Sequence, residues 1–166
     1  MMKKAFILVF VLIISLSFAG CSAPVRCEWG EFGILISGDY EKIDAEGIFD
    51  VAYSDSDAVI GITRMSLDAA LDDGIPSTLS PIKFAEEYAR RTGIDEYPIE
   101  QTGDVPYISY YTTEGGVQFF HRVAFYKSTY AYFCVVFVVR GDKEEDYSSD
   151  FLEYMESAYL NYEAIK

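Results

Sequence analysis

The segment TYAYFCVVFVVR, residues 129–140, constrains the fold more than any other part of the 166-residue sequence. It is rich in β-branched and aromatic residues, which favour strands, and it is apolar at odd and even positions alike. Because successive side chains of a strand point to opposite faces of a sheet, such a strand must be buried on both faces. The segment therefore predicts the centre of a sheet that carries a further layer of structure on each side.

Turn residues, helix caps and hydrophobic periodicity predict the remaining elements. Ser66 is a suitable N-cap for a short helix, and Ser80 followed by Pro81 begins a second helix, which Gly93 ends. The pattern predicts strands over residues 32–37, 48–53, 58–64, 97–102, 105–113, 117–127 and 129–140, and helices over residues 67–73, 81–92 and 147–160. Short turns make neighbouring strands antiparallel. We therefore expect an α+β protein, an α/β/α sandwich with a central, mostly antiparallel sheet of about 6–7 strands flanked by helices.

The amino terminus has the features of a secretory signal. Lys3 and Lys4 precede an uncharged apolar run, residues 5–19, which is shorter than the roughly 20 residues that a membrane-spanning helix needs. The run leads into FAGC, residues 18–21, which resembles the lipobox of bacterial lipoproteins. The resemblance implies cleavage before Cys21 and a diacylglyceryl (palmitate-type) anchor on its thiol. It also implies an extracytoplasmic location. We favour the outer face of the cell membrane, and an outer membrane stays an alternative. A plain thiol after an ordinary signal peptide, or an uncut anchor, stays an alternative.

This assignment divides the chain into a signal peptide (residues 1–20), a lipidated cysteine with a short tether (residues 21–30) and one globular domain (residues 31–166). The full chain has a net charge of −14, and loss of the two lysines in the signal brings it near −16. Because phosphate backbones require Lys and Arg opposite them, this charge argues against nucleic acid as a partner. Solubility explains the acidity, with affinity for cations or a basic partner as the alternative. We expect membrane contact through lipid on Cys21 and a protein partner in the envelope.

The sequence lacks the common catalytic and metal-binding patterns. His121 is the one histidine, and in a strand it shares a face with Val123, as a hydrogen-bonded core or edge residue would. No GxSxG, P-loop or closely spaced His/Cys set occurs. The D-S-D run at residues 55–57 begins like a calcium loop but lacks the required Gly and Glu, so it predicts a hairpin turn, with weak calcium binding as an alternative. We expect no catalytic residue, no cofactor and no metal site.

Two cysteines follow the lipobox, and aromatic residues crowd the second half of the chain. Cys27 and Cys134 can form a disulfide outside the cytoplasm, or remain buried thiols; the sequence leaves both open. Most of the aromatic residues are expected as cross-strand pairs in the core. Alternation places Tyr107 and Tyr111 on one face and Tyr110 on the other. These three tyrosines are a candidate binding surface on whichever face is less covered.

The order of the expected strands and helices, and the residue pattern within them, resemble those of PsbP-like domains, including bacterial lipoproteins of the DcrB type. The resemblance is carried by FGILISGDYEKI, AVIGITRMSL, SPIKFAEEYARRTG, GDVPYISYYTTEGGVQFFHRVAFYKSTYAYFCVVFVVRG and the final helix, which together span roughly residues 31–162. It implies an antiparallel sheet flanked by helices, and mostly non-enzymatic roles as accessory subunits or small binding proteins at a membrane. It carries over no catalytic residues.

These features together predict a membrane-anchored extracytoplasmic lipoprotein that acts as a non-enzymatic binding or accessory module of an envelope complex. A carboxylate-dependent hydrolase of envelope polymers is one alternative, because the chain has 27 acidic residues and glycoside hydrolysis needs a facing pair of carboxyl groups. A small-ligand capture protein with an apolar cavity under the sheet is the other.

Overall fold

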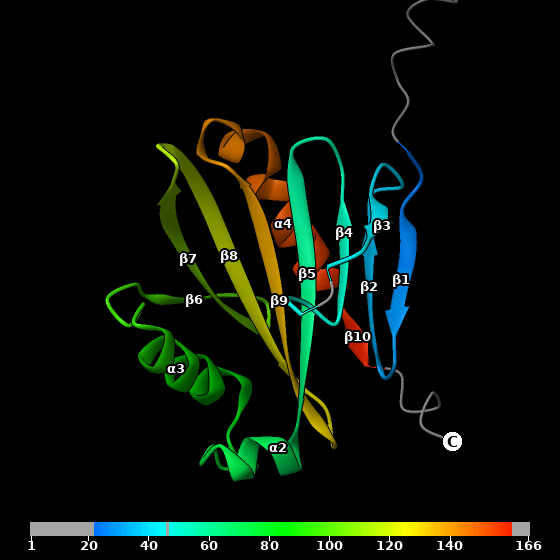
Figure 1. Cartoon of the computed structure of the whole chain (residues 1–166). Coiled ribbons are helices and arrows are strands. Elements are labelled where there is room, and N and C mark those ends of the chain that lie inside the picture. The colour runs from blue at the N-terminus through cyan, green and yellow to red at the C-terminus, as the bar shows by residue number, and fades with distance from the viewer. Residues whose placement is uncertain (1–21, 46, 161–166) are drawn as a thin grey trace, which may run out of the picture.

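A seven-stranded antiparallel sheet forms the centre of the molecule, and a three-stranded antiparallel sheet packs beside it (Figure 1). The computed structural model describes residues 22–45 and 47–160. Within these residues the central sheet has the strand order β3-β4-β5-β9-β8-β7-β6, and the small sheet has the order β1-β2-β10. The strands are β1 Val25–Trp29, β2 Phe32–Ile36, β3 Glu41–Ile43, β4 Val51–Ser54, β5 Ala58–Ser66, β6 Ile99–Thr102, β7 Val105–Glu114, β8 Val117–Lys127, β9 Ala131–Arg140 and β10 Tyr159–Leu160. The helices are α2 Leu67–Asp72, α3 Pro81–Thr92 and α4 Glu144–Ser157, with a 3-10 turn at Gly141–Lys143.

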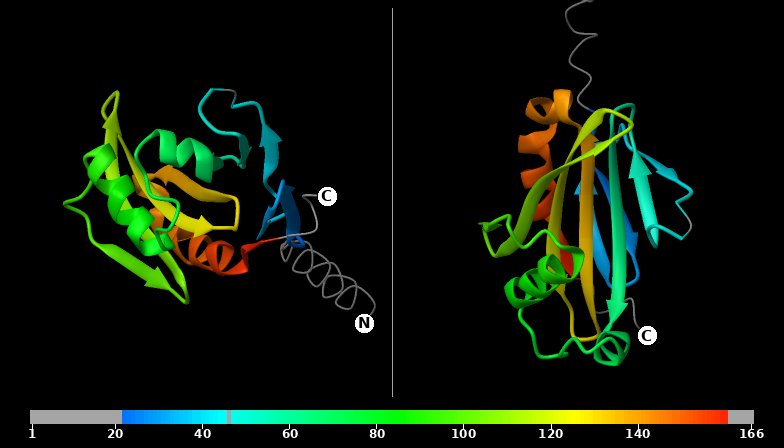
Figure 2. Two further views of the ribbon diagram at one scale, coloured as in Figure 1. Left: turned by 90° about the horizontal axis from the view of Figure 1, so that it is seen from below. Right: turned by 60° about the vertical axis from the view of Figure 1, so that its left-hand side comes forward.

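The central strand β9 is buried on both faces, as its sequence predicts. Phe133 and Phe137 belong to a core shared with the small sheet and α4, whereas Tyr132 and Cys134 belong to a core shared with α2 and α3. Figure 2 shows these layers from two further sides. The α+β sandwich is thereby confirmed, with one correction: the small sheet covers one face together with α4.

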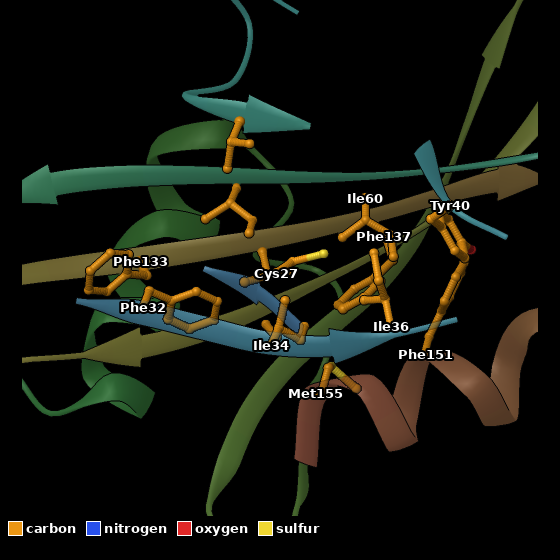
Figure 3. Close-up of a cluster of buried hydrophobic side chains, with 14 of the residues drawn as sticks. Cys27, Phe32, Ile34, Ile36, Tyr40, Ile60, Phe133, Phe137, Phe151 and Met155 are labelled. Carbon is orange, nitrogen blue, oxygen red and sulfur yellow. The ribbon is translucent and has the colours of Figure 1, made fainter. Parts of the chain in front are cut away.

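The larger core lies between the central sheet and the small sheet. Figure 3 shows its side chains, with Phe133 and Phe32 at one end and Tyr40 with Phe151 at the other. Phe32 stacks on Phe133 at a ring-centroid distance of 5.1 Å, and Phe151 lies 5.0 Å from Phe137. Aromatic contacts therefore join both covering elements to β9.

The helix caps follow the sequence prediction, but the last helix is displaced. The hydroxyl of Ser66 accepts from the backbone N–H of Ala69, and that of Ser80 accepts from Lys83, while Gly93 ends α3 with φ of +74°. The final helix was predicted over residues 147–160 but runs over Glu144–Ser157. Its first turn is acidic, which suits the positive end of the helix dipole, and its predicted last residues pair with β2 instead.

The predicted tether is also corrected, because Val25–Trp29 forms β1 and pairs with β2. Cys27 points into the larger core, and the Trp29 ring meets Phe133 edge-on at 6.4 Å. Cys27 and Trp29 alternate with the more exposed Arg26 and Glu28, and their packing in the larger core stabilises the strand. No more than Ser22, Ala23 and Pro24 then separates Cys21 from the folded domain. In the part of the chain that the structure describes, no helix has the length and apolar character needed to cross a membrane.

A buried carboxylate fastens the small sheet to the central one. Glu31, which is 3% exposed, lies in the β1–β2 turn. Its Oε1 accepts from Arg64 Nε at 3.3 Å and Nη2 at 3.2 Å, and from Ser128 Oγ at 3.2 Å. Arg64 lies on β5 and Ser128 on the β8–β9 turn, so this one side chain connects three segments that are distant in sequence.

Candidate binding groove

Three segments enclose an acidic groove beside the small sheet: the β2–β3 connection, the β4–β5 turn and the first half of α4. Its volume is about 320 Å³, at the lower end of the range of small-ligand sites. A second hollow of about 470 Å³ shares several lining residues with it and makes the groove continuous toward the end of α4. The lining carboxylates are Asp39, Asp55, Asp57, Asp146 and Asp150, and the lining tyrosines are Tyr40, Tyr147 and Tyr154. We call these residues, together with those that line the second hollow, the acidic groove.

Asp55 is held at the β4–β5 turn, where the D-S-D run predicts a hairpin. Its Oδ1 accepts from the backbone N–H groups of Asp57 at 2.8 Å and Ala58 at 2.7 Å. Its Oδ2 accepts from the Tyr147 hydroxyl of α4 at 2.9 Å. Burial raises the pKa of Tyr147, and the hydrogen bond to Asp55 raises it further. The carboxylate therefore has a fixed orientation at one wall of the groove.

Asp39 lines the groove from the β2–β3 connection, where two serines hold it. One carboxylate oxygen accepts from the hydroxyl of Ser22, and the other accepts from the Ser37 hydroxyl at 3.0 Å. The Ser22 and Ser37 hydrogen bonds lower the pKa of Asp39. Asp39 is therefore held as an anion next to Ser22, which directly follows the predicted lipidation site Cys21.

Helix α4 contributes a further row of negative charge. Asp146 lies in its acidic first turn and Asp150 one turn later, so both project from the same side of the helix. Lys143 is the single cation among the lining residues of the smaller hollow, and its Nζ lies 3.5 Å from an oxygen of Asp146. The groove keeps a large excess of negative charge.

Tyr40 forms the floor of the groove and is 9% exposed. Its ring meets Tyr154 edge-on, with centroids 6.1 Å apart. Its hydroxyl is the one buried side-chain polar atom among the described residues that has no hydrogen-bond partner. Burial raises the pKa of Tyr40, and the negative charge of Asp55 raises it further. The hydroxyl thus remains protonated in an acidic surrounding with an unused hydrogen-bonding capacity.

The three tyrosines predicted as a binding surface do not form one. Tyr107 is buried, and its hydroxyl donates to Glu100 at 3.2 Å. Tyr110 lies on the other face, where its ring stacks on His121 at 4.9 Å. Tyr111 is exposed on the first face. Alternation placed these side chains correctly, but the small sheet and α4 cover the face on which Tyr107 lies.

His121 and the two cysteines lie in structural surroundings. The Nε2 of His121 is 2.7 Å from the Thr112 hydroxyl, and burial lowers the pKa of His121. Cys27 and Cys134 are free, buried thiols in cores on opposite faces of the central sheet. The disulfide considered from the sequence is therefore absent. Burial raises the pKa of the Cys134 thiol to about 12, which removes it from thiolate chemistry.

Two further predictions from the sequence concern the lipidation of Cys21 and the binding of metal ions. Cys21 lies outside the described residues, so its lipidation stays a prediction. Among the described residues, no group of three or more His, Cys, Asp or Glu side chains is arranged to hold a metal ion. The sequence does not show that the groove residues lie together, because they come from three segments. The D-S-D run and the acidic residues at the start of α4 were the sequence features that could have indicated this site.

A separate, apolar hollow of about 300 Å³ lies between the central sheet and α3. Phe84 and Tyr88 of α3, together with Tyr132 and Cys134 of β9, form much of its wall. The Phe84 and Tyr132 rings stack at 4.2 Å. This hollow corresponds in position to the cavity under the sheet that a small-ligand capture protein would need.

Three solved structures are similar to this chain, and the first of them, at a TM-score of 0.60, supports the fold. The crystal structure of a Bacteroides thetaiotaomicron protein matches 88% of this chain at 14% identity with a TM-score of 0.60, and this chain spans about half (51%) of that protein. The solution structure of cyanobacterial PsbP (CyanoP) from Synechocystis matches 86% of this chain and 95% of its own at 13% identity and a TM-score of 0.48. The crystal structure of LpqN, involved in cell envelope biogenesis of Mycobacterium tuberculosis, matches 83% of this chain and 90% of its own at 9% identity and a TM-score of 0.45. No protein-family model and no curated protein matches this chain.

Proposed function

We propose that this protein is a membrane-anchored extracytoplasmic lipoprotein with a PsbP-like domain, and that it acts as a non-enzymatic binding or accessory module of an envelope complex. The observation that carries the proposal is the position of the acidic groove. Its wall includes Ser22, which directly follows Cys21 in sequence, and Pro24, three residues after Cys21. Because neighbouring Cα atoms are about 3.8 Å apart, a lipid on Cys21 would hold this groove close to the membrane surface.

The connection between Cys21 and β1 is short, which also favours this function. β1 begins at Val25, and the Ser22 hydroxyl already donates to Asp39. An anchor joined so closely to the domain limits the orientations that the domain can take. A surface held in one orientation near the membrane suits docking on a membrane complex better than free diffusion.

The groove chemistry favours binding over catalysis. A carboxyl group that acts as a general acid is commonly held in an apolar surrounding that raises its pKa. Asp39, Asp146 and Asp150 are exposed to solvent, and Asp55 is engaged by Tyr147 and by backbone N–H groups. This arrangement provides fixed negative charge and no evident proton donor for bond cleavage.

Photo-crosslinking in living cells tests the proposal. A photoreactive amino acid at Glu153, an exposed residue of the groove, is compared with one at Ile82, an exposed residue of α3. A specific membrane-protein adduct from position 153 and not from 82, lost in the Cys21→Ala variant, supports an anchored accessory module. No adduct from either position, or equal adducts from both, contradicts it. The amino-terminal peptide in the same samples reports whether Cys21 carries lipid.

Small-ligand capture is a second candidate, because the apolar hollow beside α3 has about 300 Å³. Thr63→Leu would fill part of that hollow from β5 without touching the acidic groove. If capture is the function, this variant should lose a lipophilic molecule that co-purifies with the wild-type chain. A wild-type chain that carries no such molecule in native mass spectra rules this candidate out.

A further inference from the structure

We propose that the acidic groove binds a basic segment of a protein partner, and that one lysine ammonium group of this segment contacts the Tyr40 hydroxyl. This inference rests on the proposed function and specifies the chemistry of the partner. It is argued from the unpaired hydroxyl, the distribution of charge and the open, extended shape of the groove.

The Tyr40 hydroxyl is the feature that requires a ligand. A buried polar group without a partner costs free energy and is rare in native structures. The groups that act on this hydroxyl electrostatically are Asp55, Asp150, Tyr147 and Tyr154, all of which line the groove. An ammonium N–H can donate to the phenol oxygen, which satisfies the acceptor capacity of the hydroxyl.

The surroundings of Tyr40 suit a lysine side chain in particular. The buried Tyr40 ring meets the half-buried Tyr154 ring edge-on, so Tyr154 supplies the apolar surface against which a lysine stem can pack. Asp55 and Asp150 supply the negative charge that balances the ammonium group. The guanidinium group of arginine is planar and prefers a bidentate acceptor, whereas Tyr40 offers one oxygen, which favours lysine.

The length of the acidic surface favours a segment over a single small cation. Negative side chains continue from Asp57 past Asp150 to Glu153, across the two connected hollows. A single amine would use one or two of these charges and leave the others repelling each other. An extended chain with several basic side chains would neutralise the row. The negative electrostatic potential of the whole protein would also steer such a basic chain toward the groove.

Other ligand classes fit this groove less well. Its excess of carboxylates repels phosphate groups and the anionic surface of a membrane. Among the described residues there is no set of three acidic, His or Cys side chains arranged to hold a metal ion. A cationic peptide is the class that matches both the charge and the shape.

Fluorescence anisotropy measures the proposed contact directly. The full chain in neutral detergent is titrated into a fluorescein-labelled peptide of alternating lysine and glycine, with a glutamine-for-lysine peptide as the probe control. Tyr40→Phe leaves the charge unchanged and should raise Kd roughly tenfold, the effect of one hydrogen bond to a charged group. Asp150→Asn should raise Kd roughly two- to fivefold, as for an exposed charge pair. Asp72→Asn makes the same charge change on α2, at the opposite end of the molecule (Figure 1), and should change Kd less than twofold.

Each outcome supports or overturns the proposal. Weakening by Tyr40→Phe and Asp150→Asn but not by Asp72→Asn supports it. Equal weakening by both aspartate variants, or no effect of Tyr40→Phe, means that binding follows net charge alone and overturns it. Tight binding of spermidine with no binding of the peptide overturns it in favour of a small polycation. If position 153 captures a partner in cells while the lysine peptide fails to bind, the accessory function stands and the basic segment is wrong.

Discussion

Replacement of Tyr40 by phenylalanine should stabilise the protein. The substitution removes only the hydroxyl, which is buried and has no partner, and keeps the ring contact with Tyr154. A buried unsatisfied polar group costs about 1–3 kcal/mol. Tyr40 keeps 9% of its surface exposed, so we take the lower part of this range and expect a gain of about 1–2 kcal/mol in the free energy of unfolding. At roughly 2–4 °C per kcal/mol for a chain of this size, Tm should rise by roughly 2–8 °C.

Tyr126→Phe is the matched control for this prediction. The Tyr126 hydroxyl is also buried, but it donates to the backbone carbonyl of Met155 at 2.9 Å. The same chemical change should therefore lower the free energy of unfolding, by about 0.5–1.5 kcal/mol. Thermal and denaturant unfolding of the full chain in neutral detergent measure both variants. A Tm of Tyr40→Phe equal to or below that of the wild type would refute the reasoning, since the hydroxyl would then be satisfied in the free protein.

Three further predictions concern the buried polar and titratable groups. Glu31→Gln should lower the free energy of unfolding, measured by urea denaturation, by about 1.5–3 kcal/mol, because Arg64 loses its charged acceptor. An unchanged free energy of unfolding would mean that this contact contributes nothing to stability. Peptide mass spectrometry of the native chain treated with a thiol reagent should find Cys27 and Cys134 unmodified and unpaired, with modification only after unfolding; a Cys27–Cys134 peptide would contradict the structure. Burial lowers the pKa of His121, so its contribution to stability is complete above the unfolded value of about 6.5 and is lost as pH falls through the lowered pKa. His121→Gln should flatten the pH dependence of Tm between the lowered pKa of His121 and about 6.5. An unchanged pH profile would mean that other groups cause the pH dependence.

Much of the fold could be predicted from local pattern. The run at residues 129–140 contains strand β9 (Ala131–Arg140), which is buried on both faces, and the caps at Ser66 and Ser80 begin the predicted helices. These features depend on side-chain alternation and on hydrogen bonds within a few residues, which the sequence displays directly. The antiparallel pairing of β4 with β5, and of β6, β7, β8 and β9 in turn, follows from the short turns between them, whereas the pairing of β5 with β9 joins strands that are distant in sequence.

The small sheet could not be predicted in the same way. β1 and β10 are short, and each is stabilised by pairing with β2 rather than by its own propensity. Residues 158–160 continue the apolar pattern of the last helix, yet Tyr159–Leu160 joins the edge of β2. Pairing with a distant strand overrode a local helical pattern at this point.

The sequence by itself determined the alternation that builds a two-faced sheet, the helix caps, the acidic net charge and the FAGC motif that predicts a lipid anchor at Cys21. Only the tertiary structure decided which charged and polar groups meet. The hydrogen bond from Tyr147 to Asp55 spans 92 residues, and that from Ser128 to Glu31 spans 97. Such contacts depend on how whole layers pack, because local patterns fix the direction of a side chain relative to its own strand or helix and not its neighbours across the fold. The acidic groove, with its unpaired Tyr40 hydroxyl, arises from that packing.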